Sequence, residues 1–162
     1  FFCKIKPSKI KSGIKTFPQP KNCLEYITKK GGVTYYNDIA STTPESTKSA
    51  IKFLEQGQLK TTNKIILIAG GEDKGMDYRN LAKEIVKKVR ILILLPGSSS
   101  SKLKESILKI NMKQRIFASP NLSKAVKIAK RNVKRGDTIL LSPNGAFFES
   151  KFGKRRDFIK SI

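Results

Sequence analysis

The sequence predicts an α/β fold in which helices cover both faces of a mostly parallel sheet. Three short runs, at residues 65–69, 91–95 and 138–141, consist almost entirely of Ile and Leu. Continuous apolar runs of this length are typical of parallel strands that are buried on both faces. Segments with helical spacing alternate with them, as in sheets built from crossover connections. The expected architecture is Rossmann-like, with ligands outside the carboxyl ends of the strands.

The first 32 residues differ from the alternating region that follows. We expect one short helix from Pro7 to Phe17, and the break Pro18-Gln19-Pro20 comes directly after it. Proline-rich breaks separate structural units of a chain. Residues 18–20 therefore mark either a domain boundary or the segment that leads into the sheet.

Residues 33–37 are a weaker strand candidate, and a helix is predicted soon after them. Pro44 and Glu45 open this helix, because proline is favoured in the first helical turn and Thr43 is a preferred N-cap. One face of the helix then carries the apolar residues Ala50, Ile51 and Leu54.

Three further helices are predicted from apolar residues that recur at spacings of three and four. The second helix carries Tyr78, Leu81, Ala82, Ile85 and Val86, and the third runs from Leu103 through Ile107 to Ile110. The fourth carries Leu122, Ala125, Val126, Ala129 and Val133, and we expect Gly136 to stop it. Residues 115–118 are a second weak strand candidate, between the third and fourth helices.

Composition limits the classes of function. The chain of 162 residues fits one ordinary domain, carries no His and has two Cys, so the usual general base and a Cys/His zinc site are not expected. The net charge of +22 indicates polyanionic partners: nucleic acid, acidic lipid or a phosphorylated ligand. Of the 34 basic residues, 27 are dispersed lysines, so nucleic acid is the less favoured partner. A membrane span is not expected, because no apolar run is long enough.

Polar loops follow three of the predicted strands. Gly70 to Gly75 includes Lys74, which can bind an anionic group beside a backbone that turns on paired glycines. Asp38 to Pro44 offers a carboxylate and several hydroxyls, and Ser142 to Phe148 ends in two aromatic residues. Each loop also has a plain structural interpretation, as a solvated turn or an N-cap cluster. The stretch Gly97 to Ser101 is expected to be a loop with an N-cap.

Three of these segments together resemble the Mur ligase family, most closely its D-glutamate-adding members. The resemblance runs from about residue 1 to the end and is carried by Asn37-Asp38-x-x-Ser41-Thr42-Thr43-Pro44-Glu45, by Leu67-Ile68-Ala69-Gly70-Gly71-Glu72-Asp73-Lys74-Gly75-Met76-Asp77-Tyr78 and by Leu141-Ser142-Pro143.

The resemblance implies an ATP-dependent amide ligase of peptidoglycan synthesis in the cytoplasm. Its substrates would be UDP-N-acetylmuramoyl-L-alanine, D-glutamate and ATP, and an acyl phosphate would be the intermediate. Residues 1–22 would be the tail of a central ATP-binding domain with its linker, and residues 23–162 the C-terminal domain that binds the amino acid. ATP and Mg²⁺ would be held mainly by the central domain, since the chain has no P-loop. By itself the chain is therefore expected to be inactive.

The resemblance also assigns residues. Thr42 and Lys74 match residues that hold the D-glutamate carboxylates, and Asp38 matches one that contacts the ribose of ATP. Phe147, Phe148 and Phe152 lie in the segment that completes the substrate site. No residue is assigned to catalysis or to a metal.

Three positions depart from the family pattern. Cys23 stands where an Arg usually reaches the nucleotide, Ala40 where many members have Lys, and Phe147 where a Ser binds the substrate's side-chain carboxylate. These departures leave a second interpretation open, that of a degenerate, non-catalytic ligase remnant.

Overall fold

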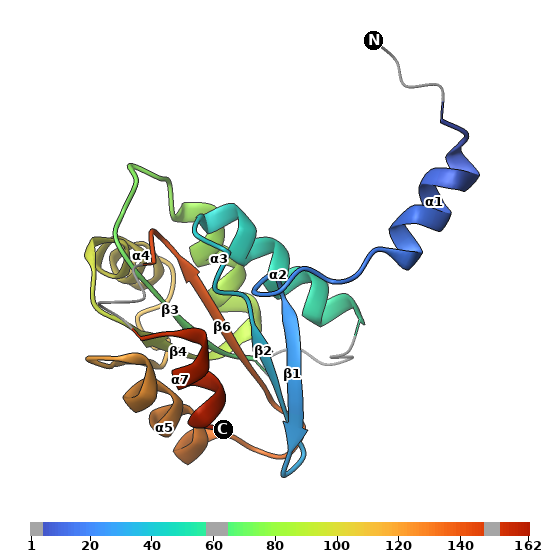
Figure 1. Cartoon of the computed structure of the whole chain (residues 1–162). Coiled ribbons are helices and arrows are strands. Elements are labelled where there is room, and N and C mark those ends of the chain that lie inside the picture. The colour runs from blue at the N-terminus through green and yellow to red at the C-terminus, as the bar shows by residue number, and fades with distance from the viewer. Residues whose placement is uncertain (1–4, 58–64, 148–152) are drawn as a thin grey trace.

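The computed structural model describes residues 5–57, 65–147 and 153–162, and it confirms the predicted alternation of strands and helices (Figure 1). The elements in chain order are α1 (Pro7–Thr16), β1 (Glu25–Lys30), β2 (Val33–Asn37), α2 (Pro44–Gly57), β3 (Ile65–Gly70), α3 (Arg79–Lys88), β4 (Val89–Leu94), α4 (Ser98–Leu108), β5 (Ile116–Ala118), α5 (Leu122–Asn132), β6 (Thr138–Asn144) and α7 (Arg155–Lys160).

The sheet has six strands in the order β1-β2-β6-β3-β4-β5. All neighbouring pairs are parallel except β1 and β2, which form an antiparallel hairpin at one edge. The chain passes from β2 to β3, continues to β4 and β5, and then returns to place β6 between β2 and β3. This reversal makes the carboxyl ends of β2, β6 and β3 the expected place for a ligand.

Two apolar layers hold the helices against the sheet. One layer joins Leu67, Leu92 and Leu140 of the sheet to residues of α2, α3 and α4, and these residues are almost completely buried. The other joins Ile66, Ile93 and Ile139 to residues of α5 and to Phe158 of α7. Helices therefore cover both faces, as predicted. In contrast, α1 projects away from the body, and its Ile10 is about half exposed.

The start of α2 follows the predicted capping. Thr43 Oγ1 accepts a hydrogen bond from Ser46 N at 3.2 Å, and the Ser46 hydroxyl accepts one from Thr43 N at 3.3 Å. Because this reciprocal cap satisfies backbone donors that a helix start leaves unpaired, it fixes the first turn of α2. Thr42, the residue before the cap, is thereby held at the carboxyl edge of the sheet.

Two predicted helix boundaries are wrong. Ser98 to Ser101 do not form a loop but the first turn of α4, where the Ser99 and Ser100 hydroxyls donate to Gly71 O at 2.7 Å and Leu95 O at 2.6 Å. These buried bonds compensate for the low helix propensity of serine. Gly136 does not stop α5, because the helix already ends at Asn132.

Two differences at other elements complete the comparison. Ile110 does not extend the buried face of α4, because the helix ends at Leu108 and Ile110 is about half exposed. The sequence also gave no indication of β1 or α7. No helix in the part of the chain that the structure describes is long and apolar enough to cross a membrane.

Candidate functional site

Three loops meet at the carboxyl edge of the sheet, where β2, β3 and β6 end. The backbone connects them directly, because Asn144 N donates to Ser41 O at 3.0 Å. Glu72 and Ala146 also exchange two backbone hydrogen bonds, at 2.9 and 2.8 Å. The loops after β2 and β3 are therefore each joined to the end of β6, as expected from the topology.

Thr42 and Lys74, the two residues predicted to bind the substrate carboxylates, lie together. Lys74 Nζ donates to Thr42 Oγ1 at 3.2 Å, although the residues are 32 positions apart. Lys74 is exposed and Thr42 partly exposed. An ammonium and a hydroxyl that face solvent side by side can both donate to one carboxylate, so the pair is suited to an acidic ligand.

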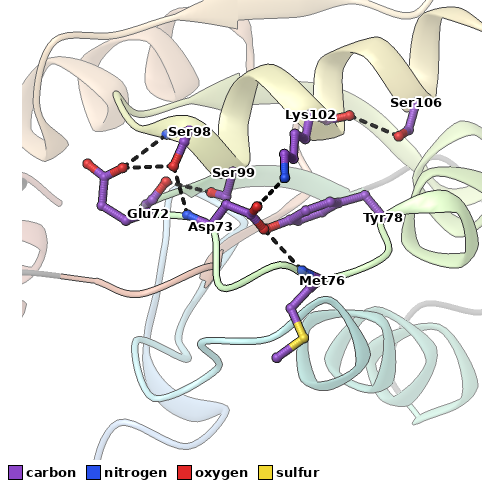
Figure 2. Close-up of polar contacts among 9 residues, drawn as sticks. Glu72, Asp73, Met76, Tyr78, Ser98, Ser99, Lys102 and Ser106 are labelled. Carbon is purple, nitrogen blue, oxygen red and sulfur yellow. Dashed lines mark hydrogen bonds and ion pairs between the residues drawn. The ribbon is translucent and has the colours of Figure 1, made fainter.

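The conformation of the Lys74 loop depends on the preceding residue, Asp73 (Figure 2). One oxygen of its carboxylate accepts from Tyr78 Oη at 2.9 Å and from Met76 N at 3.2 Å, and the other pairs with Lys102 Nζ of α4. The Lys102 ammonium, together with these donors, holds the pKa of Asp73 well below its usual range. Burial and the neighbouring Asp73 raise the pKa of Tyr78, so the tyrosine stays protonated and donates.

The start of α4 fixes the same loop from the other side. Ser98 Oγ accepts from Asp73 N at 2.9 Å and donates to Glu72 Oε2 at 2.9 Å, while Ser98 N donates to the same carboxylate at 3.2 Å. Figure 2 shows these contacts beside the Asp73–Lys102 pair. The loop that carries Lys74 is thus held at both its backbone and its side chains.

Asp38 lies inside the protein and not at its surface. Only 4% of the residue is exposed. Its Oδ1 accepts from Leu24 N at 2.8 Å and its Oδ2 from the Ser142 hydroxyl at 2.8 Å. Burial raises its pKa, although these hydrogen bonds oppose the rise. In this arrangement Asp38 holds the segment before β1 against the ends of β2 and β6.

The other predicted site residues are placed as follows. Phe147 is partly buried and packs against the apolar layer beneath α5 and α7, and it follows directly after the Glu72–Ala146 bridge. Phe148 and Phe152 lie outside the described residues. Cys23 and Ala40 are exposed. Within the described ranges, no group of three or more His, Cys, Asp or Glu side chains can hold a metal ion.

A cavity of about 420 Å³ lies elsewhere along the same edge, at the ends of β4 and β5. Its lining includes Leu95, Gly97, Lys104 and Pro120 but neither Thr42 nor Lys74. The candidate site is therefore the exposed Thr42–Lys74 pair and the loops that hold it.

The sequence did not show that Lys102 and Tyr78 support this site. Tyr78 was expected as an apolar residue of the second helix and stood at the end of a quoted motif, with no role assigned to it. Lys102 is one of many lysines and lies 29 positions from Asp73. A local pattern carries no sign of either contact, because both depend on how α4 packs beside the loop after β3.

Comparison with known proteins identifies the family to which this chain is similar. The family described as "Mur ligase, glutamate ligase domain" matches residues 24–145. A UDP-N-acetylmuramoylalanine–D-glutamate ligase of Caldanaerobacter subterraneus is 36% identical over 140 residues, which cover 86% of this chain and 29% of the relative. The ligase of the same name from Pelotomaculum thermopropionicum is 31% identical over 160 residues, 98% of this chain and 33% of the relative. The chain spans about a third of the length of these curated relatives.

Solved structures show the same fold. A murein peptide ligase Mpl from Psychrobacter arcticus matches with a TM-score of 0.66 at 12% identity, over 93% of this chain and 32% of that one. The MurF ligase from Thermotoga maritima, solved in complex with ADP, matches with a TM-score of 0.62 at 18% identity, over 90% of this chain and 32% of that one. At these identities the likeness concerns the fold alone.

Proposed function

The chain belongs to the Mur ligase family, and from this membership we propose that it is the amino-acid-binding C-terminal domain of a ligase that adds D-glutamate to UDP-N-acetylmuramoyl-L-alanine (MurD) in peptidoglycan synthesis. In the proposed reaction, ATP phosphorylates the carboxylate of the UDP-linked substrate, and the amino group of D-glutamate displaces phosphate from the acyl phosphate. The names of the relatives support this choice of substrates. We place the reaction in the cytoplasm.

The observation that carries the proposal is the contact between Lys74 and Thr42. D-Glutamate brings two carboxylates and must present an unprotonated amino group for attack. Lys74 Nζ and Thr42 Oγ1, 3.2 Å apart at the sheet edge, can hold one carboxylate and so limit the orientations of the amino group. Asp73 keeps the Lys74 loop in place through Lys102 and Tyr78. Phe147, Phe148 and Phe152 remain predicted members of the substrate site.

We propose a division of the chain near residue 22. Residues 1–22 would be the tail and linker of a central ATP-binding domain, and residues 23–162 the amino-acid-binding domain. Two observations support this division: the family match begins at residue 24, and α1 projects away from the body of the molecule. Phe17, which is 69% exposed, gives that segment an apolar surface that a further domain can cover.

The proposed enzyme needs ATP and Mg²⁺. The residues of this chain would supply only a few of the contacts that bind ATP. The described residues offer no metal site, so a central domain would hold Mg²⁺ and the triphosphate. Asp38 remains the predicted ribose contact. Each of its oxygens accepts a hydrogen bond within the chain and could accept another, but only 4% of the residue is exposed, so contact with a ribose would require that the segment over Asp38 move.

A chimera tests the proposed function. The chain replaces the matching C-terminal part of the Caldanaerobacter ligase, and phosphate release is measured with each combination of substrates. We expect release only when ATP, UDP-N-acetylmuramoyl-L-alanine and D-glutamate are all present. Lys74→Ala should abolish it, whereas Lys104→Ala, which changes an exposed lysine of α4, should leave it unchanged.

Two outcomes would contradict the proposal in different ways. Full turnover by the Lys74→Ala chimera would show that the site is wrongly assigned. A folded chimera that releases no phosphate with any acidic amino acid would favour the alternative of a degenerate, non-catalytic remnant.

A further inference from the structure

The side chain of Asn144 is buried without a hydrogen-bond partner at the centre of the candidate site. Asn144 is the last residue of β6 and has no exposed surface. Neither its Oδ1 nor its Nδ2 has a hydrogen-bond partner in the described structure. A buried amide that forms no hydrogen bond is unfavourable, because it has given up its bonds to water without replacement. Such groups are rare, and each one needs an explanation.

The position of Asn144 connects it to the Thr42–Lys74 pair. Its backbone N–H donates to Ser41 O at 3.0 Å, one residue before Thr42. It is also the register partner of Gly70, the residue at which β3 ends and the Lys74 loop begins. The two loops that carry the candidate ligand groups therefore flank Asn144.

The backbone holds this asparagine in place from both sides. Asn144 has a φ of +65°, a left-handed conformation that favours Gly and Asn. A Cβ added to the next residue, Gly145, would lie 2.7 Å from Ser99 Oγ and 2.8 Å from Glu72 O. The residue after Asn144 is therefore packed closely against the start of α4 and the loop after β3.

From these observations we propose that the side-chain amide of Asn144 is a further ligand-binding group, which donates from Nδ2 to a carboxylate oxygen of the bound amino acid. The inference rests on the proposed function. In the free chain, the Lys74–Thr42 hydrogen bond joins the two flanking loops. Asn144 is covered in the free chain, so a carboxylate that binds Lys74 Nζ and Thr42 Oγ1 reaches the amide by displacing the side chains over it, while the backbone hydrogen bonds of the two loops remain. Asn144 is thus a positioning group for the ligand, because the amide gains its hydrogen bond only when a ligand acceptor lies there.

The ¹⁵N-labelled 162-residue chain provides the test, with D-glutamate as the titrated ligand. The side-chain NH₂ resonances of Asn144 are assigned as the pair that disappears in Asn144→Gly, which removes the amide and tolerates the positive φ. We expect these resonances to shift with the same binding curve as the backbone amide of Lys74. We expect Asn144→Gly to weaken binding about tenfold, as for the loss of a hydrogen bond to a charged group, and to keep the thermal midpoint within about 4 °C of wild type.

Two further variants sharpen the test. Asn144→Asp has nearly the same shape but replaces the donor with a negative charge, so it should bind D-glutamate more weakly than Asn144→Gly. Asn111→Gly serves as a control, because Asn111 lies beside Val89 at the start of β4, at the opposite edge of the sheet. Its affinity for D-glutamate should equal that of the wild type.

The outcomes separate this inference from the proposed function. If Lys74→Ala weakens binding but both Asn144 variants bind like wild type, Asn144 is no ligand group and the proposed function stands. If Asn144→Gly lowers only the thermal midpoint, the amide has a structural partner such as a buried water, and the inference is wrong. If D-glutamate shifts no resonance of the wild-type chain, both the inference and the D-glutamate site are overturned.

Discussion

The carboxylate of Asp73 joins the Lys74 loop to α4 and to the start of α3. Its partners are Lys102 of α4, the hydroxyl of Tyr78 and the backbone N–H of Met76. Lys74 lies next in the chain, so its backbone has little freedom while these contacts hold. The rigidity of the loop reduces the entropy that the site loses when a ligand binds.

We therefore expect Asp73→Asn to weaken D-glutamate binding without removing Lys74. Asparagine keeps an acceptor for Tyr78 but loses the ion pair with Lys102, so the loop is held less firmly. Because the pKa of Asp73 is lowered in the folded chain, its stabilising effect is present above the ordinary pKa of aspartate and is lost as the pH falls through the folded pKa. Urea unfolding should therefore show a stability difference between wild type and variant near pH 7 that narrows toward about pH 2. A constant difference at all pH values would contradict this role for the charge.

Gly97 permits the close crossing between the start of α4 and the Lys74 loop. Its φ is +127°, and a Cβ there would lie 2.1 Å from Gly71 O. Gly75 also has a positive φ, of +75°, but a Cβ at that position meets nothing within 4 Å. The two glycines therefore separate the effect of backbone strain from that of steric overlap.

We expect Gly97→Ala to destabilise the chain by about 3 kcal/mol or more, because strain and overlap add. Gly75→Ala should cost only about 1 kcal/mol, from strain alone. Chemical denaturation of both variants measures the two free energies of unfolding. Equal losses of unfolding free energy in the two variants would show that the backbone near Gly97 shifts at no cost to accommodate the added Cβ.

At the scale of the elements, an ion pair fastens α7 to β1. Arg155 Nε and Nη2 of α7 donate to the two carboxylate oxygens of Glu25 at 3.0 and 2.5 Å. This pairing lowers the pKa of Glu25 to about 2. It joins residues 130 positions apart, and it supports an edge strand whose outer side has no neighbouring strand in the sheet order.

The pair predicts a specific acid sensitivity. Because the folded pKa of Glu25 lies below its ordinary value of 4.5, its contribution is complete above about pH 4.5 and is lost as the pH falls toward 2. Solvent screens the partly exposed Arg155, so we expect a loss of about 1 kcal/mol. Glu25→Gln should lower the free energy of unfolding by this amount at pH 7 and should not at pH 2. Urea titrations at the two pH values test this. Glu105→Gln, which breaks an exposed ion pair with Lys109 on α4, is the comparison and should cost about half as much or less.

The same elements show what the sequence can and cannot predict. β3, β4 and β6 were predictable because strands buried on both faces need continuous apolar runs. β1 was missed because an edge strand obtains its stability from its neighbour. The Tyr26 ring packs edge-on against the Tyr36 ring, with 5.8 Å between the ring centroids, and a local sequence pattern does not encode this contact. The start of α4 was missed for a related reason, since Ser99 and Ser100 are stabilised in the helix only by acceptors from other segments.

The candidate site divides in the same way. Thr42 and Lys74 could be expected to approach one another, because parallel strands bring their carboxyl ends to one edge of the sheet. Lys102 could not be assigned, since nothing distinguishes it from the other lysines until α4 is placed. Asn144 stood in the polar loop from Ser142 to Phe148, but an asparagine in a loop ordinarily indicates a turn. Only the burial of its unpaired amide marks it as exceptional.

At the scale of the whole molecule, the net charge of +22 has no single cause or location. Some basic residues have structural partners: Arg155 pairs with Glu25, and Lys88 with Glu55 and Glu84. Lys74 belongs to the candidate site, and Lys102 supports the loop that carries it. The positive charge of Lys74 therefore suits an acidic amino acid at one edge of the sheet. Most of the other basic residues add to the general positive charge of the surface.

The two ends of the described chain differ in how they contribute to the body of the molecule, and this difference yields a final prediction. Removal of residues 1–17 takes away α1, which projects into solvent with Ile10 and Phe17 exposed, and leaves the contacts of Gln19 and Asn22 with the segment before β1. We expect the free energy of unfolding to change by less than about 0.5 kcal/mol. The matched truncation, removal of residues 153–162, takes away fully buried Phe158 as well as Arg155, and it should cost about 4 kcal/mol or more.

Urea denaturation of the two truncated chains measures both effects, and the slope of each transition reports the surface exposed on unfolding. A large loss of stability from the first truncation would mean that α1 packs on the body in solution. The proposed boundary near residue 22 would then be wrong. If instead only the second truncation is destabilising, the cooperative unit begins after the proline-rich segment 18–20. The segment before residue 18, with Ile10 and Phe17 exposed, is then free to pack on the ATP-binding domain that the proposed reaction requires.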